Sequence, residues 1–94
     1  MACSNAIVAA LSESDRVAVA AHTRMRRLLA AVDVLNGKWS VQALEQIANR
    51  QAALFIHDEK KENCHMQLDN MELVFASNTG AAQLRWLTAI PNQP

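Results

Sequence analysis

Acidic and histidine side chains in the second half of the chain have the residue types and the spacing most suited to chemistry. On a helix, residues spaced by four, three, four and three positions project from one face. One set of residues has this spacing: Asp58, Glu62, His65, Asp69 and Glu72. We therefore expect an acidic stripe on a helix over residues 58–72.

Parts of this pattern match two kinds of metal site, but the sequence supplies only some of the ligands that each kind of site needs. Glu62-x-x-His65 has the spacing with which dinuclear helical bundles place two ligands on a metal pair, but such a site needs a second motif and further glutamates on facing helices. A dimer would have to supply that motif, and Glu45 is the one further candidate. Zinc needs three or four close ligands, whereas His57 and Cys64 are two turns apart on a continuous helix. We predict no metal site and no cofactor, and a metal-binding helical bundle is the third functional alternative.

The acidic stripe is better explained as a contact surface. Charged helix faces are usually solvated, and such a face can dock on a basic patch of another protein. We assign its carboxylates to partner binding: Asp58, Glu62, Asp69 and Glu72.

The segment 81–90 is the second candidate contact surface. Its apolar residues are distributed around much of the helix that we predict there. A helix that is apolar on several sides must be buried, in its own domain or against a partner. Because tryptophan is common at binding hot spots, we assign three residues to partner binding: Trp86, Leu87 and Ile90.

Four arginines support an alternative function. Arg24, Arg26 and Arg27 lie within one predicted helix and Arg50 lies in the next, so the two helices could form a helix-turn-helix whose cations contact phosphates. Consecutive residues point around a helix, however, and the net charge of zero gives no long-range attraction to nucleic acid. A helix-turn-helix DNA-binding regulator is therefore the alternative, with nucleic acid the less favoured partner.

A short segment in the same region resembles a known family. Val34-Leu-Asn-Gly-Lys-Trp-Ser40 is similar to the Gly-Lys-Trp segment that opens the DNA-binding region of HxlR-type winged-helix regulators. The resemblance implies a winged helix with a β-hairpin wing. The sequence predicts helix rather than hairpin over 57–77, so we carry over no residue role from this family.

Catalytic motifs are missing from the sequence. It contains no Gly-x-Ser-x-Gly, no Walker-type loop and no Gly-x-Gly-x-x-Gly. The histidines His22, His57 and His65 have no nucleophile and orienting acid at a recognisable spacing. We predict that the protein is not an enzyme.

Length and composition favour one small helical domain. The 94 residues are 51% hydrophobic and 4% aromatic, with two glycines and two prolines, which favours helices over strands. The two cysteines do not form a disulfide framework, no segment is long and apolar enough to span a membrane, and the N-terminus does not resemble a secretory signal. We expect free thiols, a cytoplasmic location and no membrane association.

Spacing and stop signals define the predicted elements. Ser12-Glu13-Ser14-Asp15 predicts the start of a helix over 14–35 that ends at Asn36-Gly37. Ser40 predicts the start of a helix over 41–56; the apolar pattern lapses over 57–63, and whether 41–77 is one helix or two stays open. The spacing of Cys64, Leu68, Met71 and Phe75 predicts a further helix, followed by the helix over 81–90.

These elements predict an all-α fold. We expect a single domain over 1–94, a small three- to four-helix bundle that forms a homodimer, with room for a short helix in segment 1–13 and a frayed tail over 91–94. The function that follows is a small non-enzymatic regulator, adaptor or inhibitor that binds another protein through helical surfaces.

Overall fold

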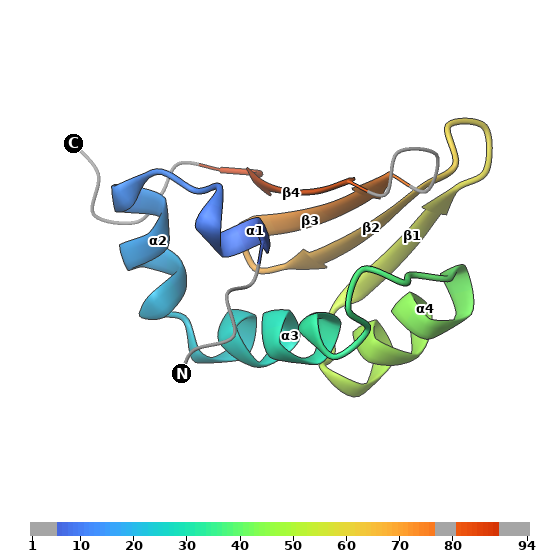
Figure 1. Ribbon diagram of the computed structural model, residues 1–94, viewed down its shortest axis with the longest axis horizontal. Helices are drawn as coiled ribbons and strands as arrows, with labels where there is room; N and C mark the ends of the chain where they lie inside the picture. Colours follow the sequence, from blue (N-terminus) through green and yellow to red (C-terminus); the bar gives the residue numbers. More distant parts are fainter. Residues whose placement is uncertain (1–5, 77–80, 89–94) are drawn as a thin grey trace.

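The computed structural model describes residues 6–76 and 81–88, and these form a layer of helices followed by an antiparallel sheet (Figure 1). The helices of the described residues are α1 (Ala6–Ala9), α2 (Glu13–Ala20), α3 (Thr23–Asp33) and α4 (Val41–Arg50). The strands are β1 (Leu54–Asp58), β2 (Asn63–Leu68), β3 (Met71–Ala76) and β4 (Ala81–Trp86), in the sheet order β1-β2-β3-β4.

The prediction of an all-α bundle is wrong. Every segment between Leu54 and Trp86 that was expected to be helical and that the structure describes belongs to a strand or a turn of this sheet. The domain is therefore an α+β fold in which the first half of the chain supplies helices and the second half a meander of antiparallel strands. The predicted tail, 91–94, and the first five residues lie outside the described residues.

The strands follow an alternation of side chains between the two faces of the sheet. Along β2, Cys64, Met66 and Leu68 are buried, and the residues between them are half-buried. Residues two apart on a strand share a face, so this period of two places the apolar side chains against the helices. On β3, Leu73 pairs with Met66 and Phe75 pairs with Cys64, which continues the same apolar face.

The helices begin where capping side chains satisfy free backbone N–H groups. The hydroxyls of Ser12 and Ser40 accept hydrogen bonds from the third residue after them, as predicted from their types. The helix expected over 14–35 is instead divided into α2 and α3. His22 divides it, because its extended backbone ends one helix and its ring Nδ1 accepts the N–H of Met25 to start the next.

Helix α4 ends at Arg50, earlier than the predicted end at residue 56, because here too an unusual residue type ends the helix. The N–H of Ala53 donates to the carbonyl of Ala48 at 2.9 Å, and Ala52 between α4 and β1 has a φ of 58°. This is the geometry of a helix C-terminus that glycine usually occupies. The chain leaves the helix here without a glycine, so the sequence contains no stop signal before residue 56.

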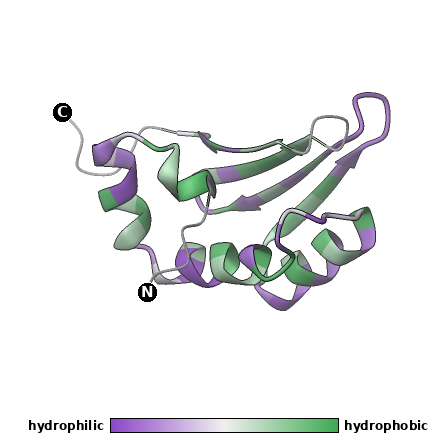
Figure 2. Cartoon of the chain, in the orientation of Figure 1, coloured by the Kyte–Doolittle hydropathy of each residue, from purple (hydrophilic) through white to green (hydrophobic). Residues whose placement is uncertain are grey.

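The core lies between the helices and one face of the sheet. It includes Met25 and Leu28 of α3, Leu44 of α4 and Leu73 of β3, each no more than 2% exposed. In Figure 1, α3 and α4 lie below the sheet and α1 and α2 lie toward its left end, and Figure 2 shows hydrophobic residues in both the helices and the strands. No helix in the described parts of the chain is long and apolar enough to cross a membrane.

Candidate functional site

The acidic stripe does not exist as one surface, because its residues lie on different strands and turns. Asp58 ends β1, where its carboxylate accepts the N–H groups of Lys60 and Lys61 at 3.1 and 3.3 Å. Glu62 lies in the following turn with a φ of 55°. The helical spacing that grouped them with Asp69 and Glu72 therefore has no structural counterpart.

Asp69 and the start of α3 meet at the opposite end of the sheet. Asp69 follows β2, and its carboxylate lies 2.7 Å from Nε2 of His22 and 3.7 Å from Nη1 of Arg24. Arg24 also donates from Nη2 to the carbonyl of Ala52 at 3.1 Å. These contacts connect the helices to the sheet, so the side chains of Asp69 and Arg24 already have interaction partners within the domain.

Glu72 is the buried member of the set, with a side chain only 5% exposed. It lies on the sheet face opposite the helices, where Gln67 donates from Nε2 to its Oε2 at 2.8 Å. Nδ1 of His65 lies 3.3 Å from the same oxygen, and Nη1 of Arg85 lies 3.5 Å from Oε1. A buried carboxylate needs such partners, so the cluster explains how this face accommodates Glu72.

The structure also separates the residues proposed for metal binding. His57 and Cys64 are neighbours across β1 and β2, but His65 lies on the other face of the sheet. Among the described residues, no three His, Cys, Asp or Glu side chains lie close enough together to hold a metal ion. Burial raises the pKa of the Cys64 thiol, which keeps it protonated at neutral pH.

The predicted C-terminal contact surface is also not helical. Trp86 ends β4 and packs half-buried against the core, and its indole N–H has no acceptor in the described residues. Leu87 follows it with 42% of its surface exposed, and its N–H donates to the carbonyl of Asn70 at 2.8 Å. Ile90 lies outside the described residues. Trp86 is therefore a core contact, and Leu87 is the exposed one of the two.

The arginines proposed for nucleic acid lie on α3 and α4 but not in one patch. Arg24 is held by Ala52 and Asp69, Arg26 and Arg27 point to different sides of α3, and Arg50 is in the last turn of α4. The single helix expected over 14–35 in the helix-turn-helix alternative is divided in two by the structure. DNA binding through α3 and α4 stays a prediction.

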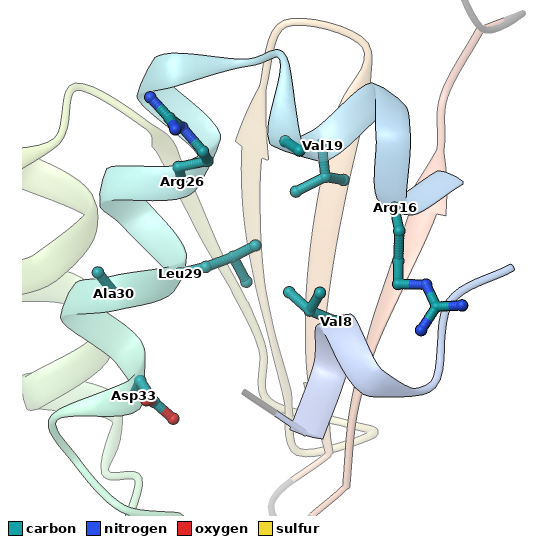
Figure 3. Close-up of a pocket in the computed structure, with 8 residues that line it drawn as sticks. Val8, Arg16, Val19, Arg26, Leu29, Ala30 and Asp33 are labelled. Carbon is teal, nitrogen blue, oxygen red and sulfur yellow. The ribbon is translucent and has the colours of Figure 1, made fainter. Parts of the chain in front are cut away.

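A groove between α1, α2 and α3 is the candidate site that the described side chains support best. Figure 3 shows Val8 of α1, Val19 of α2 and Leu29 of α3 pointing toward a common space. Its volume is about 300 Å³. That volume lies at the lower end of the range for sites that bury a ligand or a large side chain. The groove is lined by Val8, Arg16, Val19, Ala20, Arg26, Leu29, Ala30 and Asp33.

Charged side chains stand around this apolar floor. Arg16 and Arg26 contribute guanidinium groups from α2 and α3, and Asp33 lies two turns after Arg26 on α3 (Figure 3). Arg16 has an ion pair with the exposed Glu13 at 3.9 Å, which is worth little at such exposure. Arg26 has no ion pair within the described residues. The groove therefore combines an apolar surface with two cations available to a ligand.

Among the residues that line the groove, the sequence analysis assigned a role to one, and that role was a different one. Arg26 was assigned to the nucleic-acid alternative, and Arg16, Val8 and Leu29 were assigned no role. One signal was available: residues 26, 29, 30 and 33 have the spacing of one helix face. Their relation to α1 and α2 depends on the break at His22, which residue types alone did not reveal.

Comparisons of this chain with protein-family models, with curated proteins and with solved structures find no match.

Proposed function

We propose that this protein is a small non-enzymatic adaptor, regulator or inhibitor that binds a segment of another protein in the groove between α1, α2 and α3. The segment places an apolar side chain on the floor formed by Val8, Val19 and Leu29, and a carboxylate beside Arg16 or Arg26. The observation that carries the proposal is the combination of this floor with two guanidinium groups that lack a strong partner.

The chemistry of the floor favours a peptide over a nucleic acid. Proteins bind single-stranded nucleic acid by stacking bases on aromatic side chains, and none of the residues that line the groove is aromatic. Binding to duplex DNA depends on many cation–phosphate contacts, whereas this groove has two arginines and one aspartate in a chain of zero net charge. An aliphatic floor with a nearby cation suits a leucine, isoleucine or methionine next to an acidic residue.

The size of the groove sets the size of the contact. About 300 Å³ accommodates one or two side chains rather than a whole folded surface. Binding energy in such interfaces comes from a few buried anchors, while surrounding charges contribute specificity and association rate. We therefore expect recognition of a short linear segment, in the cytoplasm, where the protonated thiol of Cys64 stays reduced.

Selection from a library of displayed random peptides tests the proposal directly. Wild-type protein is the only target of the selection, and binding of the enriched peptides to the Arg16→Glu/Arg26→Glu variant is measured afterwards. Both side chains are exposed, so the fold is retained. We expect enriched peptides to carry an acidic residue within a few positions of a large apolar one, and to lose binding to the double variant.

Arg27→Glu is the matched control, because Arg27 neighbours Arg26 on α3 but does not line the groove. It makes the same charge change on the same helix. Enriched peptides should bind this control as they bind the wild type. Enrichment of peptides without an acidic residue, or equal losses with both sets of variants, would contradict the proposal.

A further inference from the structure

We infer that two copies of this chain pair antiparallel through their β1 strands, which joins two four-stranded sheets into one continuous sheet. The surface involved is the free edge of β1 (Leu54–Asp58), which is separate from the groove between α1, α2 and α3. The inference therefore does not depend on the proposed function.

The edge of β1 lacks the features that usually prevent strands from pairing. A terminal strand leaves a row of backbone N–H and C=O groups unpaired, and proteins commonly protect it with proline, lysine or a bulge. Residues 54–58 contain neither proline nor lysine. Their register with β2 runs without interruption from Leu54 opposite Gln67 to Asp58 opposite Asn63, so the strand has no bulge.

The side chains of β1 also favour association. Leu54 and Ile56 lie on the face opposite the helices and are 58% and 42% exposed. The other terminal strand, β4, presents Ala81, Gln83 and Arg85 on that face. The exposed apolar side chains are therefore concentrated on one of the two free edges.

One antiparallel register centres the two strands on Ile56. Pairing about Ile56 places it opposite the partner's Ile56, and Leu54 opposite the partner's Asp58. An isologous contact of this kind closes as a two-fold dimer. Apolar β-branched pairs on one face stabilise sheets, whereas a parallel pairing would place Asp58 beside the partner's Asp58. The antiparallel register is the one that separates these like charges.

Charge at the two ends of β1 supports the same orientation. Arg50 ends α4, shortly before the strand, and Glu59 follows the strand directly. Neither has an ion pair within the described residues. Figure 2 shows the loop after β1 as a hydrophilic tip. Antiparallel pairing brings Arg50 toward the partner's Glu59 on both sides of the two-fold axis.

Light scattering at micromolar concentration gives the first test. We expect twice the chain mass of 10.4 kDa for the wild type. Ile56→Lys places two cations opposite each other at the axis and should give the monomer mass with an unchanged circular-dichroism spectrum. Val34→Lys is the matched control, because Val34 is 82% exposed at the end of α3, and it should remain dimeric.

Charge exchange tests the orientation. Arg50→Glu and Glu59→Arg should each weaken the dimer, and the double variant Arg50→Glu/Glu59→Arg should restore it. A wild-type monomer overturns the inference, as does a dimer that Ile56→Lys leaves intact. A double variant that is weaker than both single variants overturns the antiparallel orientation. If the amides of β1 exchange freely in the protein alone and are protected only when an extended peptide of another sequence is added, the partner of β1 is not a second copy of this chain.

Discussion

Nε2 of His22 lies 2.7 Å from Oδ2 of Asp69, a contact between residues 47 positions apart in the sequence. Nδ1 of the same ring accepts the N–H of Met25 at 3.0 Å. In the neutral imidazole, therefore, Nε2 carries the proton and donates it to the carboxylate. One side chain both starts α3 and attaches it to the turn between β2 and β3.

Replacing His22 should consequently remove two interactions. We expect His22→Ala to lower the free energy of unfolding by about 1.5–2.5 kcal/mol, since an N-cap contributes about 1 kcal/mol and a hydrogen bond about 0.5–1.5 kcal/mol. Urea denaturation followed by circular dichroism measures the change. Arg27→Ala, at an exposed position on α3, is the control. Equal midpoints for the two variants would contradict the capping role.

Ala52 offers a prediction of opposite sign. Its φ of 58° lies in the left-handed region, where a Cβ atom costs about 1–2 kcal/mol and glycine has no such cost. Ala52→Gly should therefore raise the free energy of unfolding, by somewhat less than about 1 kcal/mol because glycine also gains entropy in the unfolded chain. Thermal denaturation of both proteins measures this. A lower melting temperature for the variant would show that the helix end is not held in this conformation.

The cluster around Glu72 predicts a large effect of removing one carboxylate. Glu72→Ala leaves Gln67 and His65 without their acceptor on a half-buried part of the sheet. The expected loss is about 2–3 kcal/mol, the cost of unsatisfied polar groups and of a lost charged hydrogen bond. Glu45→Ala, an exposed position on α4, should stay within about 0.5 kcal/mol of wild type. Chemical denaturation of the two variants distinguishes the outcomes, and similar losses would contradict a structural role for Glu72.

The thiol of Cys64 predicts a pH dependence at the alkaline end. Burial raises its pKa above the ordinary value of 9.0, so the native state holds this proton after the unfolded chain has released it. The stabilising contribution is complete below pH 9.0 and is lost as the pH rises from there through the native pKa. Wild type should lose stability more steeply over this window than Cys64→Ala, as measured by denaturation at several pH values. Parallel curves would contradict the assignment.

The sequence identified the starts of helices because capping depends on local residue types. Ser12 and Ser40 are N-caps as predicted, and the helices that follow them begin close to the predicted positions. The break at His22 and the end of α4 at Ala52 were missed. Histidine is an uncommon N-cap residue, and alanine is uncommon at the left-handed position that ends a helix. The residue types that usually mark a helix start or end were therefore absent at both places.

The sheet was mistaken for helix because a hairpin can imitate helical spacing. Cys64 and Leu68 share a face of β2, and Met71 and Phe75 share the same face of β3. The two-residue turn at Asp69 and Asn70 inserts a spacing of three between two spacings of four. The resulting spacings of four, three and four residues are the same as those along one face of a helix. Met66 and Leu73 are also buried, and their positions fit the alternation of a strand but not that helix face. The groove could not be predicted, because it depends on how α1, α2 and α3 pack.

The groove is proposed to bind a segment that carries an apolar side chain beside a carboxylate. Fluorescence anisotropy with one labelled peptide from the display selection measures this most directly, with wild type, Arg26→Glu and Arg27→Glu titrated side by side. We predict that Arg26→Glu weakens binding about 10-fold or more, equivalent to roughly 1.4 kcal/mol, while Arg27→Glu stays close to wild type. Equal dissociation constants for the two variants would contradict binding of the peptide's carboxylate by Arg26.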